Sequence, residues 1–176
     1  MSVDTMAKRA GAEQKAAGTG RLVVESPIGP LALVGDDRSV THLFLPNAAP
    51  GWGTSSPGAP PAALHRAAEQ LEEYFAGRRT SFDLVLEPSG TPFQLSVWWA
   101  LADIDYGHTV TYAELARRVG RPAAARAVGQ ANGANPLPIF LPCHRVVATG
   151  GLGGYGGGLD AKRRLLALEG WPGAGQ

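Results

Sequence analysis

Cysteine is almost absent from this chain of 176 residues, which contains a single one, Cys143. One thiol cannot form an internal disulfide, and without a second cysteine there is no CxxC pair to hold zinc. We therefore assign the chain no metal and no cofactor. A lone cysteine is more often a small buried hydrophobe than a nucleophile, so the residues around Cys143 must decide its role.

Long apolar runs are also missing. No stretch approaches the roughly 20 apolar residues that a membrane-spanning helix needs. Residues 1–20 carry charges but no apolar core of the kind found in secretory signals. We therefore expect residues 1–20 to be a flexible tail and the protein to be cytoplasmic, with no membrane partner.

The net charge is also small, at +1 for the whole chain. A balance so close to neutral argues against a nucleic-acid partner, but the charges are unevenly distributed. Residues 1–90 contain 8 Lys and Arg against 10 Asp and Glu, whereas residues 91–176 contain 8 against 5. The second half therefore has a modest basic surplus, which fits DNA binding and fits an ordinary solvated surface equally well.

Residues 21–90 are patterned as a small α/β domain. Three runs have strand character, and a Pro-Ile-Gly-Pro turn separates the first two: RLVVES, LALVG and VTHLFL. Residues 47–61 are rich in Pro, Gly and Ser, which predicts a loop. The stretch AALHRAAEQLEEYFA (62–76) has its apolar residues at helical spacing, and SFDLVL (81–86) predicts a further strand.

Helices dominate residues 91–172, beyond a Pro-Ser-Gly-Thr-Pro boundary at 88–92. They are predicted over Phe93–Ile104, within Thr109–Val119, from Arg121-Pro122 onward and over Leu159–Leu168. A tight turn at Gly120 joins the middle two, which is the helix-turn-helix pattern. Two packed core helices would give the same pattern. However, the second helix, AAARAVGQAN, consists almost wholly of small residues, which favours close approach to another backbone such as DNA.

Cys143 lies in the segment NPLPIFLPCHRVV, where three prolines restrain the chain. A thiol reacts as its thiolate, which the neighbouring His144 and Arg145 favour. Because adjacent side chains of an extended strand point to opposite faces, Cys143 and His144 need a bend or a bridging water to act together. The sequence thus indicates a reactive cysteine and leaves the manner of its activation open.

Two features follow this segment. The glycine-rich stretch GGLGGYGGG (150–158) lacks the phosphate-binding motif GxxxxGK[ST], and it could line a pocket for a flat ligand or form a mobile loop. Glu169 ends the last predicted helix, where a carboxylate opposes the helix dipole. A residue placed against local preference indicates another duty, such as orienting a histidine.

Together these motifs resemble the methylated-DNA–protein-cysteine methyltransferases, also called O6-alkylguanine-DNA alkyltransferases. The resemblance runs from about Thr91 to Gly170, and the N-terminal half is similar only in its general layout. It rests on PCHRV (142–146), Asn135 eight positions before the cysteine, ARAVG (125–129), VTY (110–112), Tyr155 with the glycines after it, and LEG (168–170).

The resemblance implies a two-domain α/β fold. Residues 21–90 would form a small N-terminal α/β domain with a ribonuclease H-like sheet plus helix. Residues 91–172 would form a mostly helical C-terminal domain with a winged helix-turn-helix-like DNA-binding unit. The implied activity is stoichiometric DNA repair, in which a monomer moves an alkyl group from O6-alkylguanine, and from O4-alkylthymine, in double-stranded DNA to its own Cys143.

The resemblance also implies the residues that perform the transfer. Cys143 would attack the alkyl carbon, with His144 as its base acting through a water. Glu169 would orient His144, and Asn135 would order the site.

The second helix would enter the minor groove of the DNA. There Arg126 would fill the place of the flipped guanine, and Tyr112 would help to rotate the phosphate and contact the base. Further DNA or base contacts are implied for Ala127, Gly129, Arg145, Val146, Tyr155 and Gly156.

Gly156 departs from the family pattern, since relatives often have a serine after the pocket tyrosine. The hydroxyl contact would be absent here, although the backbone N–H can still donate. We expect this difference to affect which alkyl groups fit more than whether the reaction occurs. His42, His65 and His108 have no role that the sequence indicates.

Two other functions remain open at this point. A cysteine hydrolase using Cys143 and His144 would turn over, whereas an alkyltransferase ends as a stable thioether. A DNA-binding regulator would have an inert cysteine. The relatives that bind alkylated DNA without repairing it lack the cysteine, which argues against the regulator.

Overall fold

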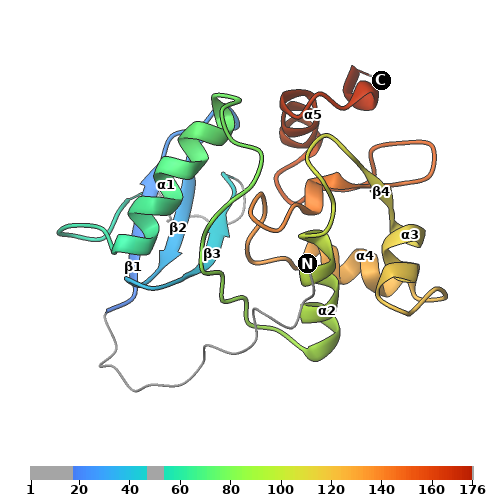
Figure 1. Cartoon of the computed structure of the whole chain (residues 1–176), viewed down its shortest axis with the longest axis horizontal. Helices are drawn as coiled ribbons and strands as arrows, with labels where there is room; N and C mark the ends of the chain where they lie inside the picture. The colour runs from blue at the N-terminus through green and yellow to red at the C-terminus, as the bar shows by residue number, and fades with distance from the viewer. Residues whose placement is uncertain (1–17, 47–53, 176) are drawn as a thin grey trace.

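The computed structural model describes residues 18–46 and 54–175, and it shows two parts lying side by side (Figure 1). The predicted tail falls mostly outside these ranges, as does the first half of the loop predicted over residues 47–61. A small sheet with one helix comes first in the chain, and a group of helices follows. This order matches the predicted fold class.

The first part contains a three-stranded antiparallel sheet in the order β1-β2-β3. The strands are β1 (Gly20–Val24), β2 (Leu31–Gly35) and β3 (Val40–Phe44), which confirms the three predicted runs. Gly29 has a φ of 105° in the turn between β1 and β2, and its N–H donates to the Ser26 carbonyl at 2.9 Å. A residue with a side chain rarely adopts this φ, so the glycine allows the tight turn.

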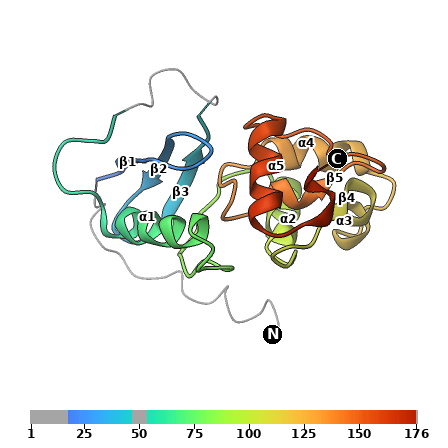
Figure 2. The same ribbon diagram turned by 90° about the horizontal axis from the view of Figure 1, so that it is seen from above.

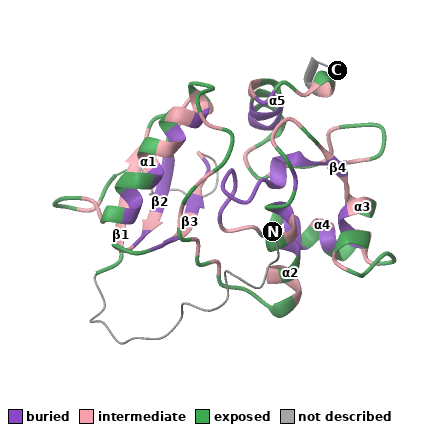
Figure 3. Ribbon diagram, in the orientation of Figure 1, coloured by how far each residue is buried: buried purple, intermediate pink, exposed green. Residues whose placement is uncertain are grey.

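Helix α1 (Ala62–Phe75) covers one face of this sheet, as Figures 1 and 2 show. Leu64, Ala67 and Leu71 recur at helical spacing and are almost completely buried. Figure 3 shows this buried stripe along the helix, with exposed residues on the other side.

The strand predicted over residues 81–86 is wrong. The segment contributes only an isolated parallel bridge between Leu86 and Val40. The side chain of Gln70 explains why. It bonds both backbone groups of Asp83, donating to the carbonyl at 3.0 Å and accepting from the N–H at 2.8 Å. These groups are therefore not available to a neighbouring strand.

The second part begins with α2 (Pro92–Leu101), which Thr91 and Gln94 cap reciprocally. It continues through α3 (Tyr112–Arg118), α4 (Ala125–Gly133) and α5 (Leu159–Leu168). The short strands β4 (Val110–Thr111) and β5 (Val146–Val147) pair in parallel beside the helices, and a short 3-10 helix, η3 (Pro172–Gly175), follows α5.

Helix α4 begins four residues later than the sequence predicts, because the backbone N–H of Arg121 bonds back to α3 and ends that helix. Gly120 has a φ of 69° and its N–H donates to Arg117, while the N–H of Arg121 donates to Ala116. This pair of bonds is the Schellman motif, which ends a helix and uses the residue after the glycine. Arg121 therefore cannot open the next helix.

The two parts share one apolar core, which extends from β2 to α5. At their contact Phe82 and Phe140 meet edge to face, with ring centroids 4.9 Å apart. The backbone N–H of Leu43 in β3 donates to the Pro136 carbonyl at 2.8 Å. This contact fixes the sheet beside the segment that leads to Cys143. Of the helices in the described ranges, none has the length and apolar character needed to cross a membrane.

Candidate active site

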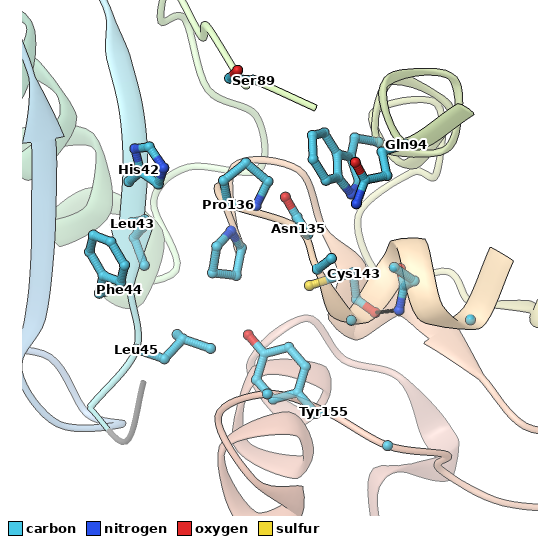
Figure 4. A pocket seen from close by; sticks show the side chains of 18 of the residues that line it. His42, Leu43, Phe44, Leu45, Ser89, Gln94, Asn135, Pro136, Cys143 and Tyr155 are labelled. Atoms are coloured by element: carbon cyan, nitrogen blue, oxygen red, sulfur yellow. Dashed lines mark hydrogen bonds between the residues drawn. The ribbon is translucent and has the colours of Figure 1, made fainter. Parts of the chain in front are cut away.

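Cys143 is the first residue of a short 3-10 turn, η2 (Cys143–Arg145). The backbone is therefore bent at Cys143 and His144, whereas an extended strand would place their side chains on opposite faces. Cys143 is only 6% exposed, and it lies at the wall of a pocket of about 630 Å³ (Figure 4). The thiol is therefore sheltered from bulk solvent and open to the pocket.

Asn135 holds the proline-rich segment that leads to this turn. Its amide donates to the Leu141 carbonyl at 2.7 Å and accepts from the Leu137 N–H at 3.0 Å. Within the same segment Ile139 has a φ of 75°, which a β-branched residue rarely adopts. Such outliers occur where surrounding contacts fix the backbone for a purpose. The ordering role of Asn135 stays a prediction, and these two bonds are the contacts through which it would act.

His144 and Glu169 form a completely buried pair. The distance between His144 Nε2 and Glu169 Oε1 is 2.8 Å, and neither side chain is exposed. The other ring nitrogen, Nδ1, has no hydrogen-bonding partner among the described residues. A carboxylate on Nε2 favours the tautomer with its proton there, which leaves Nδ1 free to accept a proton.

Glu169 occupies the C-cap position of α5, and a Schellman motif at Gly170 fixes it there. Its carboxylate also binds Arg145, with Nε 2.8 Å from Oε2 and Nη2 3.0 Å from Oε1. The Tyr74 hydroxyl donates to Oε1 at 2.7 Å, and the Gly107 N–H donates to Oε2 at 3.2 Å. These donors offset the cost of a carboxylate at a helix C-terminus.

The protonation states of these groups follow from burial and from their partners. Burial raises the pKa of the Cys143 thiol to about 11, although the hydrogen bond from Asn135 opposes it. Burial lowers the pKa of His144, so its imidazole is neutral at neutral pH. Burial alone would raise the pKa of Glu169, but hydrogen bonds from His144 and Arg145 outweigh it and lower that pKa to about 2. The site thus combines a protonated thiol, a neutral base and a charged carboxylate.

Lys162, which the sequence does not single out, holds the glycine-rich loop in place. Its ammonium group is buried and donates to the carbonyls of Val146, Leu152 and Gly154 at 2.6, 2.5 and 3.0 Å. The loop predicted as either pocket wall or mobile segment is therefore anchored at several points, with Tyr155 and Gly156 lining the pocket.

Both parts of the chain line the pocket. Helices α3 and α4 contribute Tyr112 and Gly129, and β3 contributes a wall on the opposite side (Figure 4). That wall consists of His42, Leu43 and Phe44 of β3 and of Leu45 directly after the strand. A flat ligand could enter between the two sides and reach the sulfur atom.

Comparison with known proteins identifies the arrangement. Residues 21–88 match the ribonuclease-like domain of 6-O-methylguanine DNA methyltransferase, and residues 92–171 match the DNA-binding domain of the same protein. The chain belongs to this methyltransferase family.

Its relatives cover nearly the whole chain. A Mycolicibacterium paratuberculosis protein named methylated-DNA–protein-cysteine methyltransferase is 50% identical over 152 residues, which is 83% of this chain and 89% of the relative. A protein of the same name from Methanosarcina barkeri is 48% identical over 154 residues, covering 84% and 94%. The crystal structure of Mycobacterium tuberculosis OGT in complex with DNA has a TM-score of 0.75 and 48% identity, covering 84% and 90%.

The structure of this methyltransferase-family chain places the predicted site residues in three groups. Six of them line the pocket: Tyr112, Gly129, Asn135, Cys143, Tyr155 and Gly156. His144, Arg145, Val146 and Glu169 are buried behind it, so a contact of Arg145 or Val146 with a base would come from the backbone. Arg126 and Ala127 are exposed on α4, while Val128 and Ala131 of the same helix pack inward.

The sequence missed the residues that reach the site from the N-terminal domain. His42 and Leu45 line the pocket, and Tyr74 binds Glu169 across 95 positions of sequence. The strand pattern of VTHLFL and the helical pattern around Tyr74 were visible. However, no local pattern indicates which distant residue a strand or helix will face.

Proposed function

We propose that the chain is a single-use DNA repair protein that transfers the alkyl group of O6-alkylguanine in double-stranded DNA to Cys143. O4-alkylthymine is the second proposed substrate. The proposal takes residues 1–20 as a tail, 21–90 as the N-terminal domain and 91–172 as the domain that binds DNA and accepts the alkyl group. It also takes the protein to act as a monomer in the cytoplasm.

One observation carries the chemistry: a buried, protonated thiol at a pocket, next to a neutral histidine that a carboxylate orients. Cys143 Sγ attacks the alkyl carbon, and the bond from that carbon to guanine O6 breaks with its electrons remaining on the oxygen. The thiol proton passes through a water to His144 Nδ1 and from there to the guanine. Atoms and charge balance, with a thioether and an unmodified guanine as products.

Glu169 supports the base in this scheme. As the proton arrives, the imidazole becomes an imidazolium, whose charge the adjacent carboxylate stabilises. Because the pKa of Glu169 is about 2, the carboxylate keeps its charge and does not take the proton itself.

The proposed DNA surface is the exposed side of α4. Arg126 forms no ion pair with any described residue. Ala127 beside it is exposed and has only a methyl side chain, so it does not hinder close approach to another molecule. A stacked guanine cannot present its alkyl carbon to a buried sulfur, so the base must be flipped into the pocket. We assign Arg126 to the vacated position in the stack and Tyr112 to the base, with Gly129, Tyr155 and Gly156 completing the pocket.

Intact mass spectrometry after incubation with an O6-methylguanine duplex tests the proposal. We expect one methyl group per chain, on Cys143, and no second round of repair when more duplex is added. Cys143→Ser should show no transfer and should still bind the duplex. Repeated turnover would favour a cysteine hydrolase, and binding without any adduct would favour a regulator with an inert cysteine.

A further inference from the structure

Tyr74 brings the N-terminal domain into contact with the proposed proton relay. It lies in the last turn of α1, has no exposed surface, and donates its hydroxyl proton to Glu169 Oε1 at 2.7 Å. This is the same oxygen that binds His144 Nε2. The carboxylate that orients the base is therefore shared between the two domains.

The backbone fixes both ends of this bond in the same way. Helix α1 ends in a Schellman motif at Gly77, and α5 ends in one at Gly170. Tyr74 and Glu169 thus sit in the last turns of two helices whose ends are locked. The Tyr74 ring is also packed edge to face against Tyr106, with centroids 6.1 Å apart. The hydroxyl has little freedom to seek another acceptor.

We propose that Tyr74 is a positioning residue for alkyl transfer, which acts by sharing Glu169 Oε1 with His144. Its hydroxyl fixes the orientation of the Glu169 carboxylate. Because the hydroxyl donates to Oε1, this oxygen is a weaker hydrogen-bond acceptor for His144. The N-terminal domain thereby sets the orientation and the proton affinity of the base. This inference rests on the proposed function and deepens it.

Other charged and titratable groups also face the His144–Glu169 pair. Among the described residues they are Cys143 and Arg145 from η2, Tyr106 from the α2–β4 loop, Tyr155 from the glycine-rich loop and Lys162 from α5. Of the described tyrosines, only Tyr74 donates to the carboxylate. Tyr106 donates to the Leu168 carbonyl at 3.0 Å, and the buried Tyr155 hydroxyl has no partner among the described residues. Burial and the Glu169 charge raise the pKa of Tyr74, so it remains a donor at every working pH.

The pH dependence of single-turnover transfer at saturating duplex tests the proposal. In Tyr74→Phe, Oε1 loses a donor and binds His144 more strongly, so the pKa of His144 rises and the acidic limb of the rate profile moves to higher pH. We also expect the rate at neutral pH to fall about tenfold, which corresponds to about 1.4 kcal/mol. Affinity for DNA should not change, because Tyr74 is remote from the exposed face of α4.

Tyr106→Phe is the matched control. It removes a neighbouring, partly buried hydroxyl that does not hydrogen-bond to Glu169, so the acidic limb should stay where it is in the wild type. The double variant Tyr74→Phe with Glu169→Gln should be no slower than Glu169→Gln alone, because Tyr74 acts only through that carboxylate. An unshifted acidic limb in Tyr74→Phe, an equal shift in Tyr106→Phe, or additive losses in the double variant would overturn the proposal.

A second substitution covers the case in which Tyr74→Phe does not fold. 3-Fluorotyrosine at position 74 keeps the ring and the hydroxyl but is a stronger acid, and so a stronger donor. The acidic limb should then move to lower pH, opposite to the Phe variant, and no movement would contradict the proposal. Wild-type transfer in the same assay tests the proposed function separately, so the two failures can be told apart.

Discussion

The exposed face of α4 and the buried cluster around Glu169 are built on opposite principles. Arg126 and Ala127 are exposed, and Arg126 forms no ion pair within the described ranges. Glu169, by contrast, accepts hydrogen bonds from Tyr74, Gly107, His144 and Arg145. Substitutions in the first region should cost the fold little, whereas the second region is part of the buried core.

Under the proposed function, this contrast separates DNA recognition on α4 from alkyl transfer at Cys143. A change on α4 should alter what happens to DNA and leave the reaction at Cys143 intact. A change in the buried cluster should affect every substrate, whether or not DNA is present, and should also affect stability. Free O6-benzylguanine distinguishes the two, because a free base needs no extrusion from a stack.

Glu169→Gln should have the largest effect. We expect transfer to slow about a thousandfold on both duplex and free O6-benzylguanine, because His144, the base, loses the carboxylate that orients it and stabilises its charge. Arg145 also loses its buried counter-charge, so the free energy of unfolding should fall by about 3–5 kcal/mol. Single-turnover rates and denaturant unfolding measure the two effects.

The stability loss should depend on pH. Folding lowers the pKa of Glu169 from an ordinary value of 4.5 to about 2, so its contribution is present above 4.5 and disappears as the pH falls through 2. Wild type and variant should therefore converge in acid. Glu114→Gln, which removes an exposed carboxylate paired with Arg117, is the control and should change neither rate nor stability measurably.

Arg126→Ala should have an intermediate effect and act on one substrate only. At saturating duplex we expect repair to slow about a hundredfold, or about 2.7 kcal/mol, because nothing fills the stack when the guanine leaves. The rate with free O6-benzylguanine should not change. Arg163→Ala removes the same charge from α5 and is the control. Equal slowing of both substrates would make Arg126 structural and remove the main support for placing α4 against DNA.

Gly156→Ser should have the smallest effect. A Cβ at this position meets no atom within 4 Å, and the glycine is not in the left-handed region, so stability should change by less than about 0.5 kcal/mol. Because Gly156 lines the pocket, the added hydroxyl should alter the relative rates for methyl and benzyl adducts. Gly151→Ser, equally unhindered and outside the pocket, should leave that ratio unchanged. An unchanged ratio in Gly156→Ser would mean that this position does not influence selectivity.

The fold was predictable wherever local periodicity decides it. The final helix occupies Leu159–Leu168 as predicted, and α1 differs from its prediction by one residue. The helix predicted over Phe93–Ile104 ends three residues early, at Leu101. The two larger errors arose where a partner outside the local pattern takes the backbone groups. The Gln70 side chain bonds the backbone of Asp83, and the backbone N–H of Arg121 donates to Ala116 at the end of α3. Neither bond leaves a trace in the pattern of apolar residues.

The site was predictable to the extent that it is contiguous in sequence. Cys143, His144 and Arg145 are adjacent, and Asn135 and Glu169 could be placed through the family resemblance. Lys162 was not, because a lysine on an otherwise amphipathic helix is normally solvated, and only the structure shows it buried. Tyr74 and the wall from β3 depend on the packing of the two domains, which a single sequence does not encode locally.

The raised pKa of Cys143 also protects the thiol from side reactions before it meets a substrate. Burial raises the pKa of the thiol to about 11, so it is protonated at pH 7, whereas oxidants and soft metals react with the ionised form. A reagent that is consumed by its first reaction is wasted by any reaction other than the intended one. Burial therefore preserves the unreacted thiol. We expect it to react only when a flipped nucleobase in the pocket brings its alkyl carbon to the sulfur.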